Sequence, residues 1–433
     1  MMIKYYFELA LRSFRRSPGL TALMLLTIAI GVGACMTTLT VFHVLSGDPI
    51  PAKSGQLFNI QLDAFALRGY KPGDEPPLQL TRYDAEALIR EARADRQVMM
   101  TAGGVAVELD GQKPTFTTAR YSTADFFAMF NVPVRLGRTW NAADDKAAAR
   151  VVVISDKLNE QLFGGGDPLG KVIRIREKDL TIIGVLGKWR PVPTFYDMTI
   201  GAYRNAEDVF VPFTTAMDLK FGSMGNFNCW AEHAPSTSRD SGAPCAWIQY
   251  WAELGTPEKA SAYHQYLKDY SELQRKAGRF ERPTNVGFYK VMDWLNKQEV
   301  VPSDIKLQLW LAFGFLTVCL VNTVGLLLAK CLRRSGEIGV RRALGAPRRQ
   351  IFLQFLVEAG SLGLAGGLLG LVLTGLGLWA VRNGSADYAG MIELDTAMLL
   401  TTLGLALLAS LAAGLLPAWR ATQVTPALQL KTQ

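Results

Sequence analysis

Four apolar stretches, each long enough to cross a lipid bilayer as a helix, constrain this chain more than any other feature of its sequence. Each runs for about 20 residues or more with almost no charged side chain, which suits a hydrocarbon core about 30 Å thick. The stretches are residues 19–44, 305–331, 350–381 and 396–419. A chain of 433 residues would also suit two or three soluble domains, but this clustering of apolar residues predicts an integral membrane protein.

The first apolar stretch follows several cationic residues and so has the charge pattern of a secretory signal peptide. Its apolar run is about twice as long as a signal-peptide core, and no A-x-A cleavage pattern follows it. We therefore expect an uncleaved membrane anchor. Residues 1–18 mix aromatic and cationic side chains, which is typical of a helix in the membrane interface. The alternative is a helix that extends the first span into the cytoplasm.

The distribution of positive charge predicts the orientation of the four spans. Lys and Arg concentrate in residues 1–18 and 332–349, whereas residues 382–395 contain one Arg and three acidic residues. Both termini, including residues 420–433, and the 332–349 segment are therefore expected in the cytoplasm, with residues 45–304 outside. The net charge of +8 reflects this asymmetry, so it does not indicate binding of nucleic acid.

Residues 45–304 form a polar segment that is long enough for one or two globular subdomains. Strand and helix patterns alternate along it, so we expect an α+β or mixed α/β domain. Ser155 is expected to cap a helix, and Ser122 or Thr123 to cap a shorter one. The Asp-Gly pair at residues 110–111 predicts the turn of a β-hairpin.

Two cysteines, Cys229 and Cys245, lie in a Gly/Ser/Pro-rich insertion of this outer segment. Outside the membrane a disulfide is chemically permitted, and it would close a loop that has no core of its own. We therefore expect these two residues to be bonded. The alternative is a zinc site that also uses His233 and His264, but the spacing matches no standard zinc motif.

The stretch GGGDPLGK, residues 164–171, resembles from Gly165 onward the phosphate-binding loop of ATPases. Val172 stands where that loop needs a hydroxyl for magnesium, and a β-rich pattern follows where it needs a helix. The stretch also lies in the outer segment, where no ATP pool exists. We expect an ordinary turn, no cofactor on this chain, and neither catalytic residues nor a metal site.

The predicted spans contain almost no ionisable side chain, whereas a secondary transporter needs ion or proton sites there. Glu358 is the exception, and we expect it to pair with Arg348 or Arg349 near the membrane interface. Glycines recur four residues apart in the third span, a spacing that lets helices approach closely: Gly363 and Gly367, Gly366 and Gly370. This span is therefore expected to pack on another helix or on a second subunit, which suits transmission of motion.

Residues 332–349 predict a short amphipathic helix between two spans. Ser335 is expected to cap it, Gly345 to end it and Pro347 to start the next helix. Held between two spans, such a helix can act as a lever that docks on a partner protein. The alternative is a basic loop at the membrane surface without a partner. The candidate contact residues are Glu337, Ile338, Val340, Arg341, Ala343 and Leu344.

Three stretches carry a resemblance to a known family. EIGVRRALGAPRRQI, residues 337–351, and PAWRATQVTPALQLK, residues 417–431, resemble the membrane domain of MacB/FtsX-type ABC transporter permeases. The stretch from Tyr121 to Ile175, which includes FGGGDPLGK as a turn, is similar to the periplasmic core domain of the same permeases.

The resemblance implies a permease in the bacterial inner membrane that forms a dimer with a second copy or with a sister permease. Because the sequence contains no ATPase domain, a separate cytoplasmic ABC ATPase is expected to bind ATP and magnesium. Its movement would pass through the short cytoplasmic helix to the periplasmic domain and drive efflux of a peptide, an antibiotic or another amphipathic substrate. Such permeases often work with a periplasmic adaptor and an outer-membrane channel.

Two other functions fit the same resemblance. An FtsX-like permease regulates an extracytoplasmic hydrolase or sensor without transport, and a lipoprotein-releasing permease passes its cargo to a periplasmic carrier. FtsX relatives in cell division usually have a much smaller outer domain than residues 45–304, which favours the exporter. The insertion around Cys229 and Cys245 departs from the family pattern.

Overall fold

The computed structural model describes residues 2–109, 113–231, 238–384 and 396–423. The chain divides into two compact units. One unit combines Met1–Ser46 with Val301–Gln433, and the other is Gly47–Val300. The first is helical and holds the four predicted spans, and the second is the predicted outer domain.

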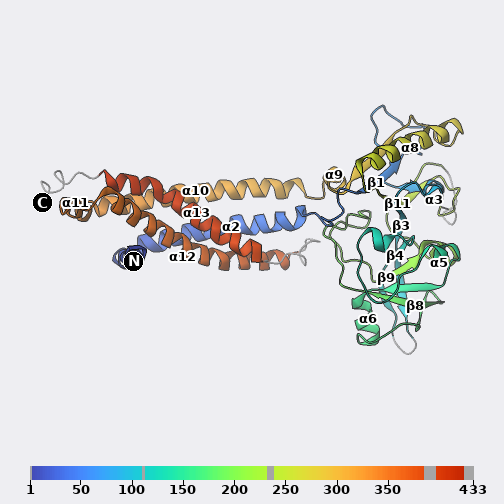
Figure 1. Cartoon of the computed structure of the whole chain (residues 1–433), viewed down its shortest axis with the longest axis horizontal. Coiled ribbons are helices and arrows are strands. Elements are labelled where there is room, and N and C mark those ends of the chain that lie inside the picture. The colour runs from blue at the N-terminus through green and yellow to red at the C-terminus, as the bar shows by residue number, and fades with distance from the viewer. Residues whose placement is uncertain (1, 110–112, 232–237, 385–395, 424–433) are drawn as a thin grey trace. The chain divides into compact units, whose positions relative to one another are not determined.

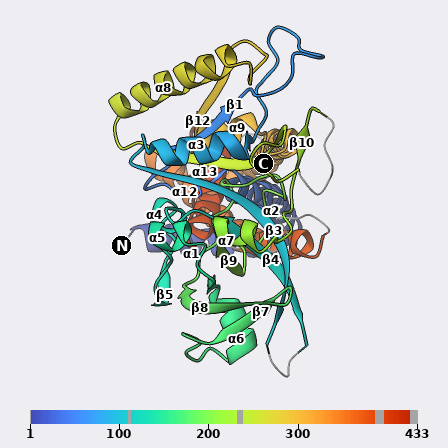
Figure 2. The ribbon, with the colours of Figure 1, turned by 90° about the vertical axis from the view of Figure 1, so that its right-hand side faces the viewer.

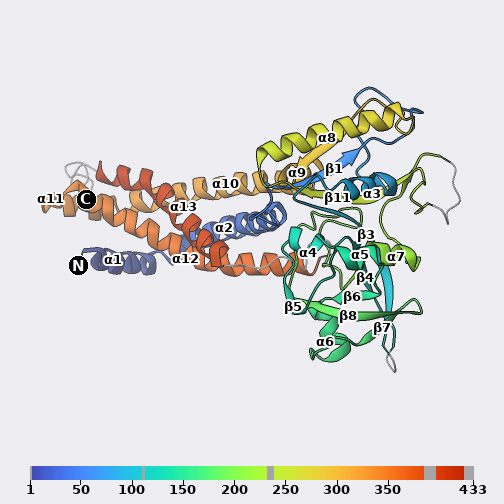
Figure 3. The ribbon, with the colours of Figure 1, turned by 45° about the vertical axis from the view of Figure 1, so that its right-hand side comes forward.

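The helical unit consists, in its described residues, of six helices, four of which are long and apolar enough to cross a membrane: α2, α10, α12 and α13 (Figure 1). The prediction of four spans is therefore confirmed. A short helix, α11, connects α10 to α12, and α1 packs along α12 (Figure 3). The bounds are α1 Met2–Arg16, α2 Pro18–Ser46, α10 Ser303–Arg333, α11 Ser335–Ala343, α12 Arg348–Arg382 and α13 Thr396–Thr422.

The glycines of the third span lie on two faces of α12. Gly363 and Gly367 face α13, where a Cβ on Gly367 would lie 2.8 Å from the Cβ of Ala406. Gly366 and Gly370 face α2, and a Cβ on Gly366 would lie 2.8 Å from Cγ2 of Ile28. The two pairs of glycines therefore let α12 pack closely against two helices of the same chain, because glycine has no side chain to keep the backbones apart.

The second unit is built on a mixed sheet, which confirms the predicted α/β class. Its main path runs β12-β1-β11-β3-β4-β9-β6-β8-β5, while β2 and β10 pair with β11, and β7 pairs with β3 and β8. The β4–β9 and β6–β8 pairs are parallel and the other pairs on this path are antiparallel. The strands are β1 Leu57–Leu62, β2 Leu80–Thr81, β3 Arg96–Glu108, β4 Thr115–Ser122, β5 Val134–Gly137, β6 Val151–Ile154, β7 Val172–Ile175, β8 Lys178–Leu186, β9 Val209–Pro212, β10 Asn228–Cys229, β11 Cys245–Glu253 and β12 Val286–Lys290.

Helices lie at both ends of this sheet. Figure 2 shows α3 and α8 near β1 and β12, and α6 near β7 and β8 at the opposite end. The helices are α3 Arg82–Glu91, α4 Phe126–Met129, α5 Ala142–Lys146, α6 Asp156–Phe163, α7 Phe213–Asp218, α8 Pro257–Lys276 and α9 Val291–Lys297.

Of the two helix caps expected in the outer segment, one is confirmed and one is wrong. Ser155 caps α6, since its side chain accepts a hydrogen bond from the backbone N–H of Leu158. The prediction that Ser122 or Thr123 caps α4 is wrong: β4 continues through Ser122, and Asp125 precedes the helix without a side-chain cap bond. Ser122 pairs with residues of β3 and β9, so it belongs to the sheet and does not cap the helix. The strands β3 and β4 form the predicted hairpin pair, and its turn lies outside the described residues.

The Gly-rich stretch follows a helix and precedes a strand. A phosphate-binding loop has the opposite order, because its glycines lead into the N-terminus of a helix. α6 ends at Phe163 and its C-cap, Gly164, has φ +60°; Gly165 and Gly170 also have left-handed backbones, with φ +78° and +76°. Glycine adopts this region without steric cost, so these residues form a turn. The Nζ of Lys171 lies 4.9 Å from the ring centroid of Phe163, so the cation rests on an aromatic face of the same turn.

Candidate functional site

The short helix α11 differs at both ends from the sequence expectation. Arg334 occupies the N-cap position without a side-chain cap bond, so Ser335 is the first helical residue rather than the cap. Gly345, with φ +97°, lies just beyond the helix, and Pro347 is the N-cap of α12 rather than its first residue. The segment is still a discrete helix that is followed by Gly345 and Pro347, as the sequence indicates.

The two faces of α11 have different surroundings. Ile338 is only 6% exposed and belongs to an apolar cluster with Ile351 and Phe355 of α12. Val340 and Leu344 are 50% and 83% exposed. Ile338 was expected to contact a partner together with Leu344, but its burial shows that it anchors the helix. The apolar side chains open to a partner are those of Val340, Ala343 and Leu344.

Glu358 is buried in the helical unit and is surrounded by positive charge. Its Oε1 lies 2.6 Å from the Nζ of Lys330 and accepts a hydrogen bond of 2.6 Å from the Oγ of Ser13. Its Oε2 lies 3.4 Å from Nη1 of Arg334. The expected pairing with Arg348 or Arg349 is therefore wrong. Those residues lie nearly three turns from Glu358, a rise of roughly 15 Å along α12, so they are too far away.

A second carboxylate extends this group of charges to α11. Glu337 lies 2.7 Å from Nη2 of Arg341 and 3.5 Å from Nε of Arg334, measured from its Oε1 and Oε2. Arg334 also donates a hydrogen bond of 2.8 Å to the Oγ of Ser13. We call this group the coupling cluster, which consists of Ser13, Lys330, Arg334, Glu337, Arg341 and Glu358.

The coupling cluster joins four helices through ion pairs and hydrogen bonds. Ser13 comes from α1, Lys330 from α10, Glu337 from α11 and Glu358 from α12. At the other end of α11, Nη1 of Arg342 donates to the backbone carbonyl of Thr422 in α13. Displacement of α11 must therefore either move these helices or break the interactions, of which the Lys330–Glu358 pair is buried and those of Glu337 are partly exposed.

Sequence reasoning found Glu337, Arg341 and Glu358 but missed Ser13, Lys330 and Arg334 as their partners. The available signal was general: an ionisable side chain within an apolar span requires a partner. It did not identify the partner, because Ser13 is 345 residues from Glu358 in sequence, and Lys330, on the neighbouring helix α10, meets Glu358 only after the helices pack.

The outer domain contains the predicted cysteine pair. Cys229 and Cys245 form a disulfide and stand opposite each other where β10 pairs with β11. The bonded sulfurs are not thiolate ligands, which argues against the zinc alternative, and His264 stacks on the Phe288 ring with 4.9 Å between centroids. His233 lies outside the described residues, among which no group of three His, Cys, Asp or Glu side chains is placed to hold a metal ion.

Comparisons with known proteins agree with this architecture. Residues 21–241 match the MacB-like periplasmic core domain, and residues 309–426 match the FtsX-like permease C-terminal region. The pyoverdine export ATP-binding/permease protein PvdT of Pseudomonas aeruginosa is 26% identical over 416 residues, which cover 95% of this chain and 56% of PvdT. The macrolide export ATP-binding/permease protein MacB of Syntrophobacter fumaroxidans is 23% identical over 454 residues, which cover 98% of this chain and 63% of that protein.

The chain thus spans between half and two thirds of the length of these two relatives. Among solved structures, the periplasmic region of MacB from Actinobacillus actinomycetemcomitans aligns with a TM-score of 0.38 and 14% identity, covering 59% of this chain and 96% of that one. The match to the periplasmic core domain alone extends over residues 21–241 of 433, slightly more than half of the sequence. This chain belongs to the MacB/FtsX-type family of ABC transporter permeases.

Proposed function

We propose that this chain is an exporter permease in which α11 passes ATP-driven movement from a cytoplasmic ATPase to the spans and the periplasmic domain. The observation that carries the proposal is the coupling cluster. Its buried pair, Lys330 and Glu358, joins the spans on either side of α11, and Glu337 extends the cluster onto α11 itself. A helix held in this way transmits displacement to several spans at once.

The proposed docking surface is the exposed side of α11, formed by Val340 and Leu344. The concentration of Lys and Arg around α11 and before the first span favours a cytoplasmic location for that end of the bundle and for both termini. ATP and magnesium would bind to the ATPase, and the permease would work as a dimer of identical or sister chains.

For the substrate we propose an amphipathic molecule. The relatives PvdT and MacB are named for export of pyoverdine and macrolides, which supports this class without selecting one compound. A periplasmic adaptor and an outer-membrane channel would complete the path. The alternative functions are regulation of a hydrolase or sensor and release of lipoproteins, and the purification experiment described next distinguishes them from export.

That experiment is purification of the chain from its native membrane in mild detergent, followed by mass spectrometry of the proteins that accompany it. An ATPase with a periplasmic adaptor is the expected result. An ATPase with a hydrolase or sensor kinase would instead indicate the regulatory function. Absence of any ATPase under conditions that preserve other ABC complexes would contradict the proposal.

A point substitution tests the docking surface directly. Leu344→Glu places a charge on the exposed end of α11 and is expected to abolish binding of the ATPase while the permease still inserts in the membrane. Leu273→Glu is the matched control, because Leu273 is a 62% exposed leucine on α8 in the outer domain. Retention of ATPase binding and of substrate-stimulated ATP hydrolysis in Leu344→Glu would show that α11 is not the lever.

A further inference from the structure

A pocket of about 660 Å³ lies in the outer domain and has no role in the function proposed above. Its size is within the range of small-molecule sites in proteins. One wall comes from the start of α6, including Lys157 and Glu160, and the other from the segment between β8 and β9. Leu186 and Phe210, at the ends of those two strands, provide apolar lining.

The segment between β8 and β9, residues 187–208, contains neither helix nor strand but is firmly packed. Connections of this length without secondary structure are uncommon inside compact domains, and the ordered ones are usually functional. Phe195 and Tyr196 are buried in an aromatic cluster. The ring of Trp189, which lines the pocket, stacks on Tyr196 with 5.4 Å between centroids, so the aromatic wall has a defined position.

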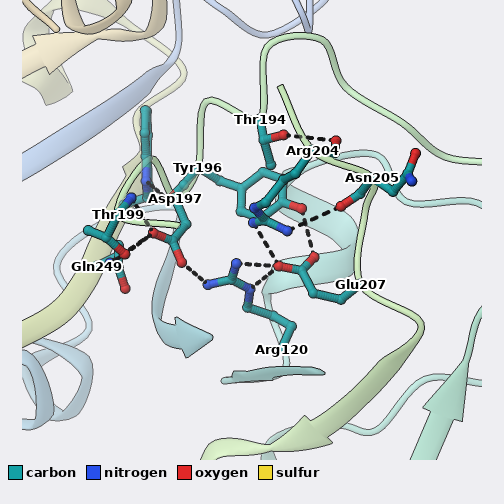
Figure 4. Close-up of polar contacts among 10 residues, drawn as sticks. Arg120, Thr194, Tyr196, Asp197, Thr199, Arg204, Asn205, Glu207 and Gln249 are labelled. Atoms are coloured by element: carbon teal, nitrogen blue, oxygen red, sulfur yellow. Dashed lines mark hydrogen bonds and ion pairs between the residues drawn. The ribbon is translucent and has the colours of Figure 1, made fainter. Parts of the chain in front are cut away.

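A buried charge network beneath the pocket fixes this segment to the sheet. Arg120 of β4 is fully buried and lies between two carboxylates of the segment, with Nη1 2.6 Å from Oδ2 of Asp197 and Nε 3.0 Å from Oε1 of Glu207 (Figure 4). Arg204 adds a second cation, 2.8 Å from Glu207, and the hydroxyl of Tyr196 donates to Glu207 at 2.8 Å. Two cations and two carboxylates therefore balance each other.

Glu207 lines the pocket but contributes no free negative charge to it. Burial raises the pKa of Glu207, but the charges of Arg120 and Arg204 outweigh burial and lower the pKa to about 2. Two other acidic residues of the lining are also compensated. Asp208 lies 3.2 Å from Nζ of Lys157, and Asp156 lies 3.1 Å from Nε of Arg135.

The charges that remain at the pocket are mainly positive. Lys188 and Arg190 flank Trp189 and form no ion pair within the described residues. Glu160 is the one lining carboxylate without an ion pair in the same part of the chain. An aromatic ring between two exposed cations suits a ligand that carries both an anionic group and a flat apolar group.

We propose that this pocket binds a small aromatic carboxylate, with the carboxylate at Lys188 and Arg190 and the ring against Trp189. The Arg120 network would act as a positioning element, because it holds the segment that carries all three residues. The pocket lies entirely within the outer domain, so the proposal does not depend on α11 or on an ATPase.

The test uses the full-length chain in lipid nanodiscs and isothermal titration with 2-naphthoate. The neutral 2-naphthamide is the matched ligand, and we expect it to bind more weakly. The double variant Lys188→Gln/Arg190→Gln is expected to weaken naphthoate binding roughly 5- to 30-fold, the effect of losing two partly exposed ion pairs. Glu160→Gln is expected to strengthen it, because it removes an opposing charge.

The matched control is Lys268→Gln/Lys276→Gln, which removes the same charge from exposed positions on α8. We expect it to leave binding unchanged. Equal weakening of naphthoate binding in the two double variants would show that only the net charge of the protein matters, which would overturn the proposed site. Equal affinity for naphthamide, or naphthoate binding that neither double variant changes, would also overturn it. Unchanged melting temperatures of all variants establish that they are folded.

Discussion

Lys330 and Glu358 form an ion pair in the interior of the helical unit, with 2.6 Å between Nζ and Oε1 and with 4% and 2% of their side chains exposed. They belong to α10 and α12, which are connected through α11. A buried pair of this kind adds little net stability relative to an apolar pair, but it is costly to break, because the buried charge that remains loses its nearest ionic partner.

We therefore expect Glu358→Gln or Lys330→Met alone to lower the free energy of unfolding by roughly 3–5 kcal/mol. The double variant Lys330→Met/Glu358→Leu is expected to recover most of this loss, since no partner of the pair is left charged. Equilibrium unfolding in mixed micelles measures the three values. Additive losses in the double variant would show that the pair is not coupled. If the pair also transmits movement, the double variant will be folded but deficient in coupled ATP hydrolysis.

The glycine stripes predict a difference between two positions on the same helix. Gly363→Ala places a methyl group against the Oγ of Ser410, and we expect overpacking to cost roughly 1–3 kcal/mol of unfolding free energy. Gly375→Ala is the control, because nothing lies within 4 Å of the added Cβ. Its helix propensity predicts a neutral effect or a gain of up to about 1 kcal/mol. Equal effects at the two positions would contradict the close packing of α12 on α13.

The disulfide predicts a redox-dependent stability. Cys229 and Cys245 are 16 residues apart, and closing a loop of this length is expected to stabilise the folded state by about 3 kcal/mol. The double variant Cys229→Ala/Cys245→Ala should lose about this amount of unfolding free energy. Reductant should destabilise the wild type and leave the variant unchanged. A wild type insensitive to reductant would mean that the bond contributes nothing to stability.

A pH dependence is expected from Asp145. Burial raises the pKa of Asp145 to about 7, assisted by the nearby carboxylates of Asp125 and Asp144. The folded state therefore holds a proton that the unfolded chain releases near pH 4, so this group stabilises the fold at low pH and the contribution is lost as the pH rises through about 7. Asp145→Asn cannot ionise. Its melting temperature relative to wild type should rise between about pH 4 and about pH 8 and then level off.

Asp218→Asn is the control for Asp145→Asn, because Asp218 is exposed and its substitution removes one carboxylate that is open to solvent. A constant difference between Asp145→Asn and wild type across the pH range would show that the carboxyl of Asp145 titrates normally in the folded protein.

The spans were predictable because apolar length is a property of contiguous residues. The conformational preferences of a few neighbouring residues also made three local features predictable. These are the Ser155 cap, the turn around Gly165 and the short helix α11, which ends before Gly345. The cap expected at Ser122 failed because a strand partner distant in sequence competed for the same backbone.

The amino-acid sequence by itself determined the membrane class, the order of the segments, the mixed α/β outer domain and the position of α11. Only the tertiary structure decided which charge neutralises Glu358, which face of α11 is open, and how Arg120 is matched by Asp197 and Glu207. The physical reason is that a buried charge requires a partner in space rather than in sequence. Lys330 lies in the last turn of α10 and Glu358 nearly three turns inside α12, and they meet only because the helices pack side by side, a relationship that no local pattern encodes.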